Sequence, residues 1–212
     1  MLTQAYFDRF YDWVVRPIKN QQDLKLLDEI DVANFGERAL SIERLESLHR
    51  RYPEGHRLCC LQDTIIGYIT LWPMAKQMAE DFCGGKLREK DLLPIDIEQF
   101  QEEGGGTQDW YIGGMVIDPA FRRPIKDNPV GLLLAMAMNS WAESGKLSYP
   151  ARVFTTAYSK EGEALLRRFG FELLRSGLEM PDGDPLYSRT ALNKNDLFEV
   201  FIKHGIPNIF SV

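Results

Sequence analysis

The sequence has 212 residues, of which 44% are apolar and 26% charged, a composition typical of one globular domain and not of a disordered chain. Its 25 basic and 31 acidic residues give a formal net charge of −6, which argues against a nonspecific nucleic-acid-binding surface. The longest apolar run, Val130 to Met138, is shorter than the ~18 residues that cross a bilayer, so we expect no contact with a membrane.

Three cysteines without CxxC spacing and three scattered histidines predict neither a disulfide framework nor a metal site. The first residues lack the basic start and the small-residue cleavage site of a secretory signal, so we expect a cytoplasmic protein with reduced thiols. No repeat interrupts the chain, and residues 1–212 are therefore predicted to form a single domain. Its core spans about residues 13–192, with additions at 2–12 and 193–212.

Apolar periodicity defines the predicted elements. Asn20 and Ser41 are suited to cap helices, and two β-rich runs separated by three polar residues predict a hairpin. Residues 74–108 are too long for a plain connection, and such loops are often functional. In chain order we predict a helix at 3–12, a strand at 13–16, helices beginning at Asn20 and Ser41, strands at 56–61, 65–72 and 110–117, a helix at 128–145, a strand at 152–157, a helix at 159–169, strands at 171–174 and 186–191, and a helix at 195–204.

Two adjacent glycines, Gly113 and Gly114, lie in the middle of the fourth predicted strand, where we expect a bulge. The next helix begins at Asn128 and Pro129, close to three basic residues of the preceding loop. A helix amino terminus offers unpaired N–H groups and the positive end of a dipole, so it suits a phosphate group. We therefore expect a local anion site here in an otherwise acidic protein.

The order of these elements resembles that of the GNAT acyltransferase superfamily over about residues 13–192. The segment 115–122, MVIDPAFR, resembles the family's V-x-P-x-x-R approach to its acyl-coenzyme A loop, and 165–171, LLRRFGF, resembles its L-Y-x-K-x-G-F segment. The resemblance implies a mixed α/β (α+β) fold with a mostly antiparallel central sheet, flanked by helices, in which strands four and five splay apart. The loop is altered: it contains an insertion, and Pro129 removes one N–H donor.

The resemblance also implies acetyl-CoA as the co-substrate. Backbone groups of the kinked strand would bind the carbonyl and pantetheine, and the helix start would bind the pyrophosphate. Ser159 falls at the family's asparagine position. The residues assigned to acyl-CoA are Met115, Val116, Ile117, Arg122, Arg123, Lys126, Asn128, Val130, Gly131, Leu132 and Ser159.

Acyl transfer to an amine also needs a base and a proton source for the thiolate. The glutamate of histone-acetylating members falls here on Tyr111, so we expect Asp109, two residues earlier on the same side of a regular strand, to act as the base. The family's tyrosine acid falls on Leu166, which cannot donate a proton. Tyr158, at the end of the fifth strand, is the candidate to replace it.

Two functions follow from these residues. The first is an N-acyltransferase that acetylates an amine of a small molecule or peptide by direct transfer. The alternative is a catalytically weak or inactive GNAT-like module that binds acyl-CoA or another protein, which Leu166 and Pro129 favour. Residues 74–109 hold nine acidic and four basic residues, a charge that favours a cationic acceptor, although it also suits a solvated insertion. The apolar terminal segments can pack on the domain or on a second copy, as in a homodimer.

Overall fold

A computed structural model describes residues 13–95, 108–121, 129–144, 147 and 149–203. The predicted helix at 3–12 and the tail beyond residue 203 lie outside the described residues. Among the described residues, no helix is both long enough and apolar enough to span a bilayer.

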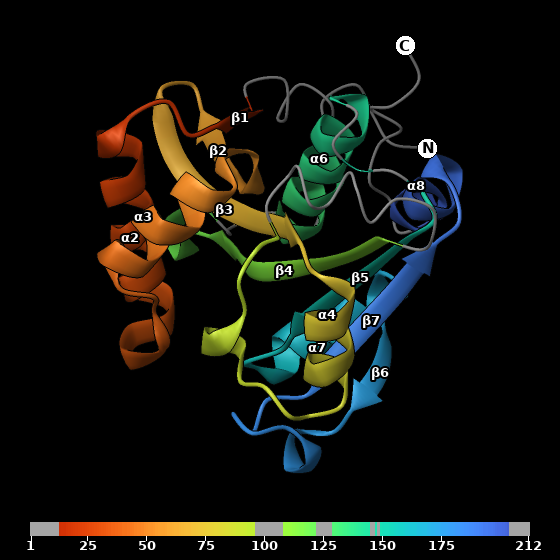
Figure 1. The fold of residues 1–212 in the computed structure, drawn as a ribbon. Coiled ribbons are helices and arrows are strands. Elements are labelled where there is room, and N and C mark those ends of the chain that lie inside the picture. The colour runs from red at the N-terminus through yellow and green to blue at the C-terminus, as the bar shows by residue number, and fades with distance from the viewer. Residues whose placement is uncertain (1–12, 96–107, 122–128, 145–146, 148, 204–212) are drawn as a thin grey trace.

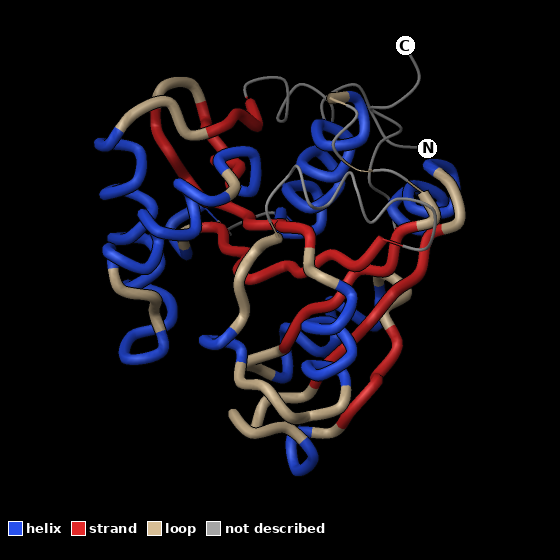
Figure 2. Tube along the Cα trace, viewed as in Figure 1, coloured by secondary structure: helices blue, strands red, loops and turns tan. Residues whose placement is uncertain are grey.

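Seven strands form one twisted sheet in the order β1-β2-β3-β4-β5-β7-β6 (red in Figure 2). Neighbouring strands of this sheet are antiparallel, except β4 and β5, which are parallel. The predicted fold, a mixed and mostly antiparallel sheet flanked by helices, is confirmed. The strands are β1 (Trp13–Pro17), β2 (His56–Leu61), β3 (Thr64–Pro73), β4 (Gln108–Ile117), β5 (Ala151–Thr156), β6 (Glu172–Arg175) and β7 (Leu186–Ala191).

Helices cover both faces of the sheet. One face packs against α6, and the other packs against α2 and α3, which lie together at the left of Figure 1. The excursion between β3 and β4 contains a helix that the sequence pattern did not predict, α4, and a short 3₁₀ turn at Glu89–Asp91. The helices are α2 (Gln21–Phe35), α3 (Ile42–Arg51), α4 (Lys76–Cys83), α6 (Pro129–Glu143), α7 (Lys160–Arg168) and α8 (Lys194–Lys203).

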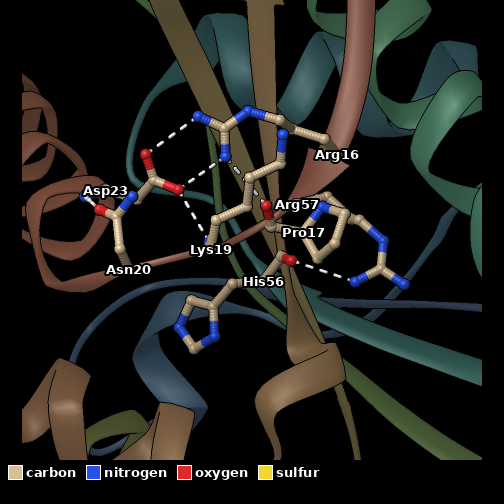
Figure 3. Close-up of polar contacts among 7 residues, drawn as sticks. All are labelled: Arg16, Pro17, Lys19, Asn20, Asp23, His56 and Arg57. Carbon is tan, nitrogen blue, oxygen red and sulfur yellow. Dashed lines mark hydrogen bonds and ion pairs between the residues drawn. The ribbon is translucent and has the colours of Figure 1, made fainter.

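The start of α2 is fixed by polar contacts (Figure 3). The Asn20 side chain accepts a hydrogen bond from the Asp23 N–H at 3.0 Å, which confirms the predicted cap. The Asp23 carboxylate in turn accepts from the Arg16 guanidinium at 2.6 and 2.9 Å and from the Lys19 N–H at 2.8 Å. These bonds attach α2 to the edge strand β1. The helix ends at Gly36, whose φ of +58° is a left-handed conformation that favours glycine.

The predicted bulge lies in β4. Leu71 on β3 is opposite Ile112, and the preceding residue of β3, Thr70, is opposite Gly114. Gly113 is therefore the extra residue of a β-bulge. A Cβ atom at this position would lie 2.3 Å from Cη2 of the Trp72 ring, so the ring leaves room only for glycine.

Candidate active site

The strands β4 and β5 part at the bulge. Their parallel pairing runs from Gln108 opposite Ala151 to Ile112 opposite Thr155 and goes no further. The β5 side of β4 beyond Ile112 therefore has no strand partner and faces open space. The splayed strands expected from the family resemblance are confirmed.

A wide cleft of about 620 Å³ opens between the parted strands. Its walls are the bulged part of β4, the end of β5, the first turns of α7 and the end of α2. Of the residues predicted to bind acyl-CoA, Met115, Val116, Val130 and Ser159 line this cleft. Along this cleft the edge of β4 offers backbone N–H and C=O groups to an extended ligand.

A narrow cleft of about 450 Å³ lies on the side of α2, α3 and the loop before β7. Its wall carries five carboxylates against three basic side chains, so it is acidic. These charged residues are Asp31, Glu37, Glu89, Asp182 and Asp184, and Arg38, Arg44 and Lys90. Only Glu89 and Lys90 come from the acidic excursion that the sequence singled out; the other charges come from separate segments.

The two clefts meet at the bulge. Four residues line both of them: Phe35, Gly113, Gly114 and Tyr158. Two molecules bound in the two clefts would therefore come together where β4 leaves β5.

Glu89 lies at this junction and is hydrogen-bonded to hydroxyl groups. Its carboxylate accepts from the Tyr158 hydroxyl and, at 3.0 Å, from the Thr156 hydroxyl, while the Tyr111 hydroxyl lies 3.2 Å from Thr156 Oγ1. Burial raises the pKa of the Glu89 carboxyl, and the hydroxyls of Tyr158, Tyr111 and Thr156 offset part of that rise. A carboxyl with a raised pKa at a cleft junction is suited to accept and release protons.

Tyr158 is coupled to Glu89. Burial, followed by the negative charge of Glu89, raises the pKa of Tyr158 well above its ordinary value. The phenol therefore holds its proton as long as Glu89 is charged, and holds it less tightly once Glu89 is protonated.

A second tyrosine–carboxylate pair lies in the narrow cleft. The Tyr68 hydroxyl donates to the Asp31 carboxylate, which also accepts from the Leu40 N–H at 2.9 Å. Burial raises the pKa of Asp31, and the hydrogen bonds from Tyr68 and Leu40 lower it. Asp31 thus closes the loop after α2 and presents its carboxylate at the cleft wall.

The predicted base, Asp109, has a different partner. Its carboxylate accepts from the Arg152 guanidinium at 2.8 and 2.9 Å, and the residue is 5% exposed. It lines neither the wide nor the narrow cleft. The assignment of Asp109 as the base stays a prediction, and the ion pair with Arg152 is an observation against it.

The alternation on which that prediction relied does not pass the bulge. Asp109 and Tyr111 are on one side of β4, but the extra residue Gly113 shifts the pattern, so Gly114 and Val116 continue that side. Met115 is on the opposite side and contacts the core that packs against α6. The regular strand on which the assignment of Asp109 rests would have put Met115 on the side of Asp109, and the bulge makes that expectation wrong.

The remaining predicted residues fall into three groups. Arg122, Arg123, Lys126 and Asn128 lie outside the described residues. Ile117 and Leu132 are buried in the core, 0% and 3% exposed, so their side chains are not cleft residues. Gly131 is within the first turns of α6.

Three residues stand at positions that the family resemblance singled out, and two of them, Ser159 and Leu166, line the wide cleft. The Ser159 hydroxyl accepts from the Gly162 N–H at 3.0 Å and so caps α7. Leu166, at the position of the family's tyrosine, is 3% exposed and lines the wide cleft. Tyr111, at the position of the family's glutamate, is fully buried.

Cysteine and metal chemistry find no support among the described residues. Burial raises the pKa of the Cys59 thiol to about 12 and that of Cys83 to about 11, so neither is a nucleophile near neutral pH. In that part of the chain no group of three or more His, Cys, Asp or Glu side chains could hold a metal ion.

Comparisons with known proteins agree with the geometry. No family model matches the sequence, and no curated protein matches it. The structure is similar to one chain of the NatC complex bound to Gag peptide and CoA, with 11% sequence identity and a TM-score of 0.57. The match covers 86% of this chain and 99% of that one. It is also similar to Naa50 of Arabidopsis thaliana in complex with a bisubstrate analogue of CoA, with 12% sequence identity and a TM-score of 0.55. This match covers 85% of this chain and 99% of that one.

A third similar structure is FeeM, an N-acyl amino acid synthase from uncultured soil microbes, with 11% sequence identity and a TM-score of 0.57. The match covers 85% of this chain and 89% of that one. At such identities the likeness shows the fold, which is that of the GNAT N-acetyltransferases.

Proposed function

We propose that this chain, which has the GNAT fold, is an N-acyltransferase that moves an acyl group, in the first instance acetyl, from acyl-CoA to an amine of a small molecule or peptide. The observation that carries the proposal is the meeting of two clefts at Gly113, Gly114 and Tyr158, where β4 leaves β5. Structures of the same fold bind CoA, a CoA bisubstrate analogue or a peptide, or make N-acyl amino acids, and this supports the proposal.

The wide cleft is the proposed place of the acyl donor. The unpaired edge of β4 from Gly113 to Val116 offers backbone groups to the amides of pantetheine and to the thioester carbonyl. The first N–H groups of α6, at Val130, Gly131 and Leu132, would bind the pyrophosphate, with Arg122, Arg123, Lys126 and Asn128 as the further groups predicted from the sequence.

The proton path assigned to the reaction runs through Glu89 and Tyr158. As the amine nitrogen forms its bond to the carbonyl carbon and the carbon–sulfur bond breaks, Glu89 takes the proton that the nitrogen loses. Protonation removes the negative charge that adds to the effect of burial on the Tyr158 pKa, so the phenol holds its proton less tightly and gives it to the departing thiolate. The proton on Glu89 then returns along the hydrogen bond to the phenolate, and both groups are restored.

Asp109 and Tyr111 keep secondary places in this proposal. Asp109 is the alternative base, and it would first have to release Arg152. Tyr111 supports the Glu89 carboxylate from a fully buried position.

The second candidate function is a GNAT-like module that binds acyl-CoA without transferring the acyl group. Leu166 favours it, because a leucine lines the wide cleft at the place of the family's acid. The difference between the two functions is turnover and not binding.

The deciding experiment has two steps. Thermal unfolding is first measured with and without acetyl-CoA, since a ligand at about a hundred times its dissociation constant stabilises a protein by ~2.7 kcal/mol. Release of free CoA thiol is then followed with a panel of amines and amino-terminal peptides. Stabilisation with amine-dependent thiol release supports the enzyme, stabilisation without release for any acceptor supports the binding module, and no stabilisation refutes both.

Gly131→Val tests the placement of the pyrophosphate. A valine side chain in the first turn of α6 would keep the phosphates from the backbone N–H groups, so we expect weaker acetyl-CoA binding by calorimetry. Unchanged affinity in a folded variant would place the phosphates elsewhere.

A further inference from the structure

Three oxygen-bearing side chains lie together on the wall of the narrow cleft. Tyr68 and Thr70 are two residues apart on β3 and so point to the same side of the strand. Asp31, on α2, is hydrogen-bonded to the Tyr68 hydroxyl. All three line the narrow cleft, and none of them lines the wide one.

The two glycines of the bulge lie against two of these oxygens. A Cβ at Gly114 would lie 3.0 Å from the Tyr68 hydroxyl oxygen, and one at Gly113 would lie 3.1 Å from Thr70 Oγ1. The two hydroxyls therefore face the junction of the clefts from the narrow side.

Within the part of the chain that the structure describes, the Thr70 hydroxyl has no hydrogen-bond partner. Thr70 is 4% exposed, and its Oγ1 atom is completely buried and unpaired. A buried hydroxyl without a partner destabilises the folded state, and such a group in a native protein calls for a ligand or a water molecule. Because the residue lines a cleft, a bound ligand can supply the missing partner.

Asp31 lacks a cationic partner among the described residues. Its carboxylate receives two neutral hydrogen bonds, from Tyr68 and Leu40, and the charged group that acts on it, Asp28, is also acidic. A carboxylate that is 5% exposed and not paired with a cation is expensive to keep ionised.

The arginines of the same cleft are engaged elsewhere. Arg38 donates to both oxygens of Asp184 at 2.8 and 2.9 Å. Arg44 donates to the backbone carbonyls of Lys90 and Leu92, at 3.1 and 2.5 Å. Neither guanidinium is bonded to Asp31, so the charge of that carboxylate is left for a ligand.

We propose that Asp31, Tyr68 and Thr70 form a subsite for an ammonium group that does not react, and that the acceptor amine is therefore a short alkyl diamine. An alkylammonium has three N–H donors, and the subsite offers three acceptors: one carboxylate and two hydroxyl oxygens. The reacting amine of the same molecule lies at Glu89, whose partner Tyr158 belongs to both clefts. This assignment rests on the proposed N-acyltransferase function for the choice of the reacting end.

Affinity tests the subsite without any acyl transfer. The full chain is titrated calorimetrically with putrescine and with butylamine, which has the same carbon chain and one ammonium. We expect putrescine to bind roughly tenfold more tightly or better, because only a diamine can place one ammonium at Asp31 and its other amine at Glu89 at the same time. Equal affinities for the two amines, or no binding of putrescine, would overturn the proposal.

Two variants separate the subsite from general electrostatics. Asp31→Asn keeps the shape and an acceptor for the Leu40 N–H but loses the charge, and it should remove the preference for putrescine. Glu37→Gln removes one charge from the same cleft at an exposed position and should keep the preference. A preference that survives Asp31→Asn, in a variant with an unchanged melting temperature, would place the second ammonium elsewhere.

Turnover distinguishes this proposal from the proposed function. If thiol release occurs with both amines at equal kcat/KM, the chain is an acyltransferase and the diamine subsite is refuted. If putrescine binds selectively and no amine releases thiol, the subsite stands and the acyltransferase proposal fails. Thr70→Val, which removes the unpaired hydroxyl at nearly constant volume, should weaken putrescine binding and leave butylamine binding unchanged.

Discussion

The Glu89→Gln variant tests the proposed proton path most directly. Glutamine keeps an oxygen that can accept from the Tyr158 and Thr156 hydroxyls, so the junction of the clefts should keep its shape. It cannot take a proton from the amine. A positioned general base contributes about 10² to 10⁴ in rate, so we expect kcat to fall by that factor, ~2.7 to 5.4 kcal/mol in the barrier.

The assay is steady-state thiol release over a range of pH, with acetyl-CoA affinity measured by calorimetry. In the parent protein the rate should rise with pH through the pKa of Glu89, which burial places above its ordinary range. In Glu89→Gln this limb should disappear while acetyl-CoA affinity is unchanged. Asp109→Asn is the matched control, and we expect it to lower stability by breaking the ion pair with Arg152 and to change kcat only slightly.

The outcome decides between the two carboxylates. Full activity in Glu89→Gln together with a large loss in a folded Asp109→Asn would refute the path through Glu89 and support the base predicted from the sequence. If Glu89 and Tyr158 act as one unit, the double variant with Tyr158→Phe should be little slower than Glu89→Gln alone.

Three further predictions concern the free energy of unfolding. Because the pKa of Glu89 is raised in the folded protein, the native state binds this proton more tightly than the unfolded chain does. The free energy of unfolding should therefore fall as pH rises from about 4.3, the unfolded pKa, through the folded pKa. The variant Glu89→Gln should lack this loss of stability. Gly113→Ala would place a Cβ against the Trp72 ring and should lower the free energy of unfolding by ~1 to 3 kcal/mol in chemical denaturation. Its control is Gly162→Ala at the start of α7, where a Cβ would make ordinary contacts and the change should be neutral or stabilising. Arg16 holds the pKa of Asp23 below its usual range, so Asp23→Asn should cost ~1 to 3 kcal/mol at neutral pH. The cost should shrink as pH falls from about 4, where the unfolded carboxylate binds a proton, through the lower pKa of the native carboxylate.

Local signals in the sequence predicted most of the fold. Alternation, capping residues and glycine positions depend on near neighbours in the chain, and all seven strands were predicted within about two residues of their observed ends. The helix α4 was missed because Ala79 and Phe82 are its only fully buried residues and Gly84 and Gly85 follow directly. An apolar face this small does not show as a helical period.

The candidate site was harder to predict because it depends on segments far apart in the chain. Tyr158 was predicted from its place at the end of a strand, and it lies at the junction. Asp31 and Glu89 are separated by 58 positions and lie in a helix and a 3₁₀ turn whose packing no local pattern specifies. The available signal was the unusual length of the excursion at 74–108, which indicated a functional segment but not which of its acids enters the cleft.

The position of the proposed base follows from the demands on β4. In the proposed function this strand offers its backbone edge beyond the bulge to the acyl donor. The two glycines must stay small because Trp72 and Tyr68 lie against them. A carboxylate on the same strand would have to stand before the bulge, as Asp109 does, and there it is beside β5 and paired with Arg152. A carboxylate supplied by the excursion reaches the junction from the other side of the cleft and leaves the strand free to bind the donor. The geometry of the bulge is thus the reason for placing the proposed acid–base group in the insertion between β3 and β4.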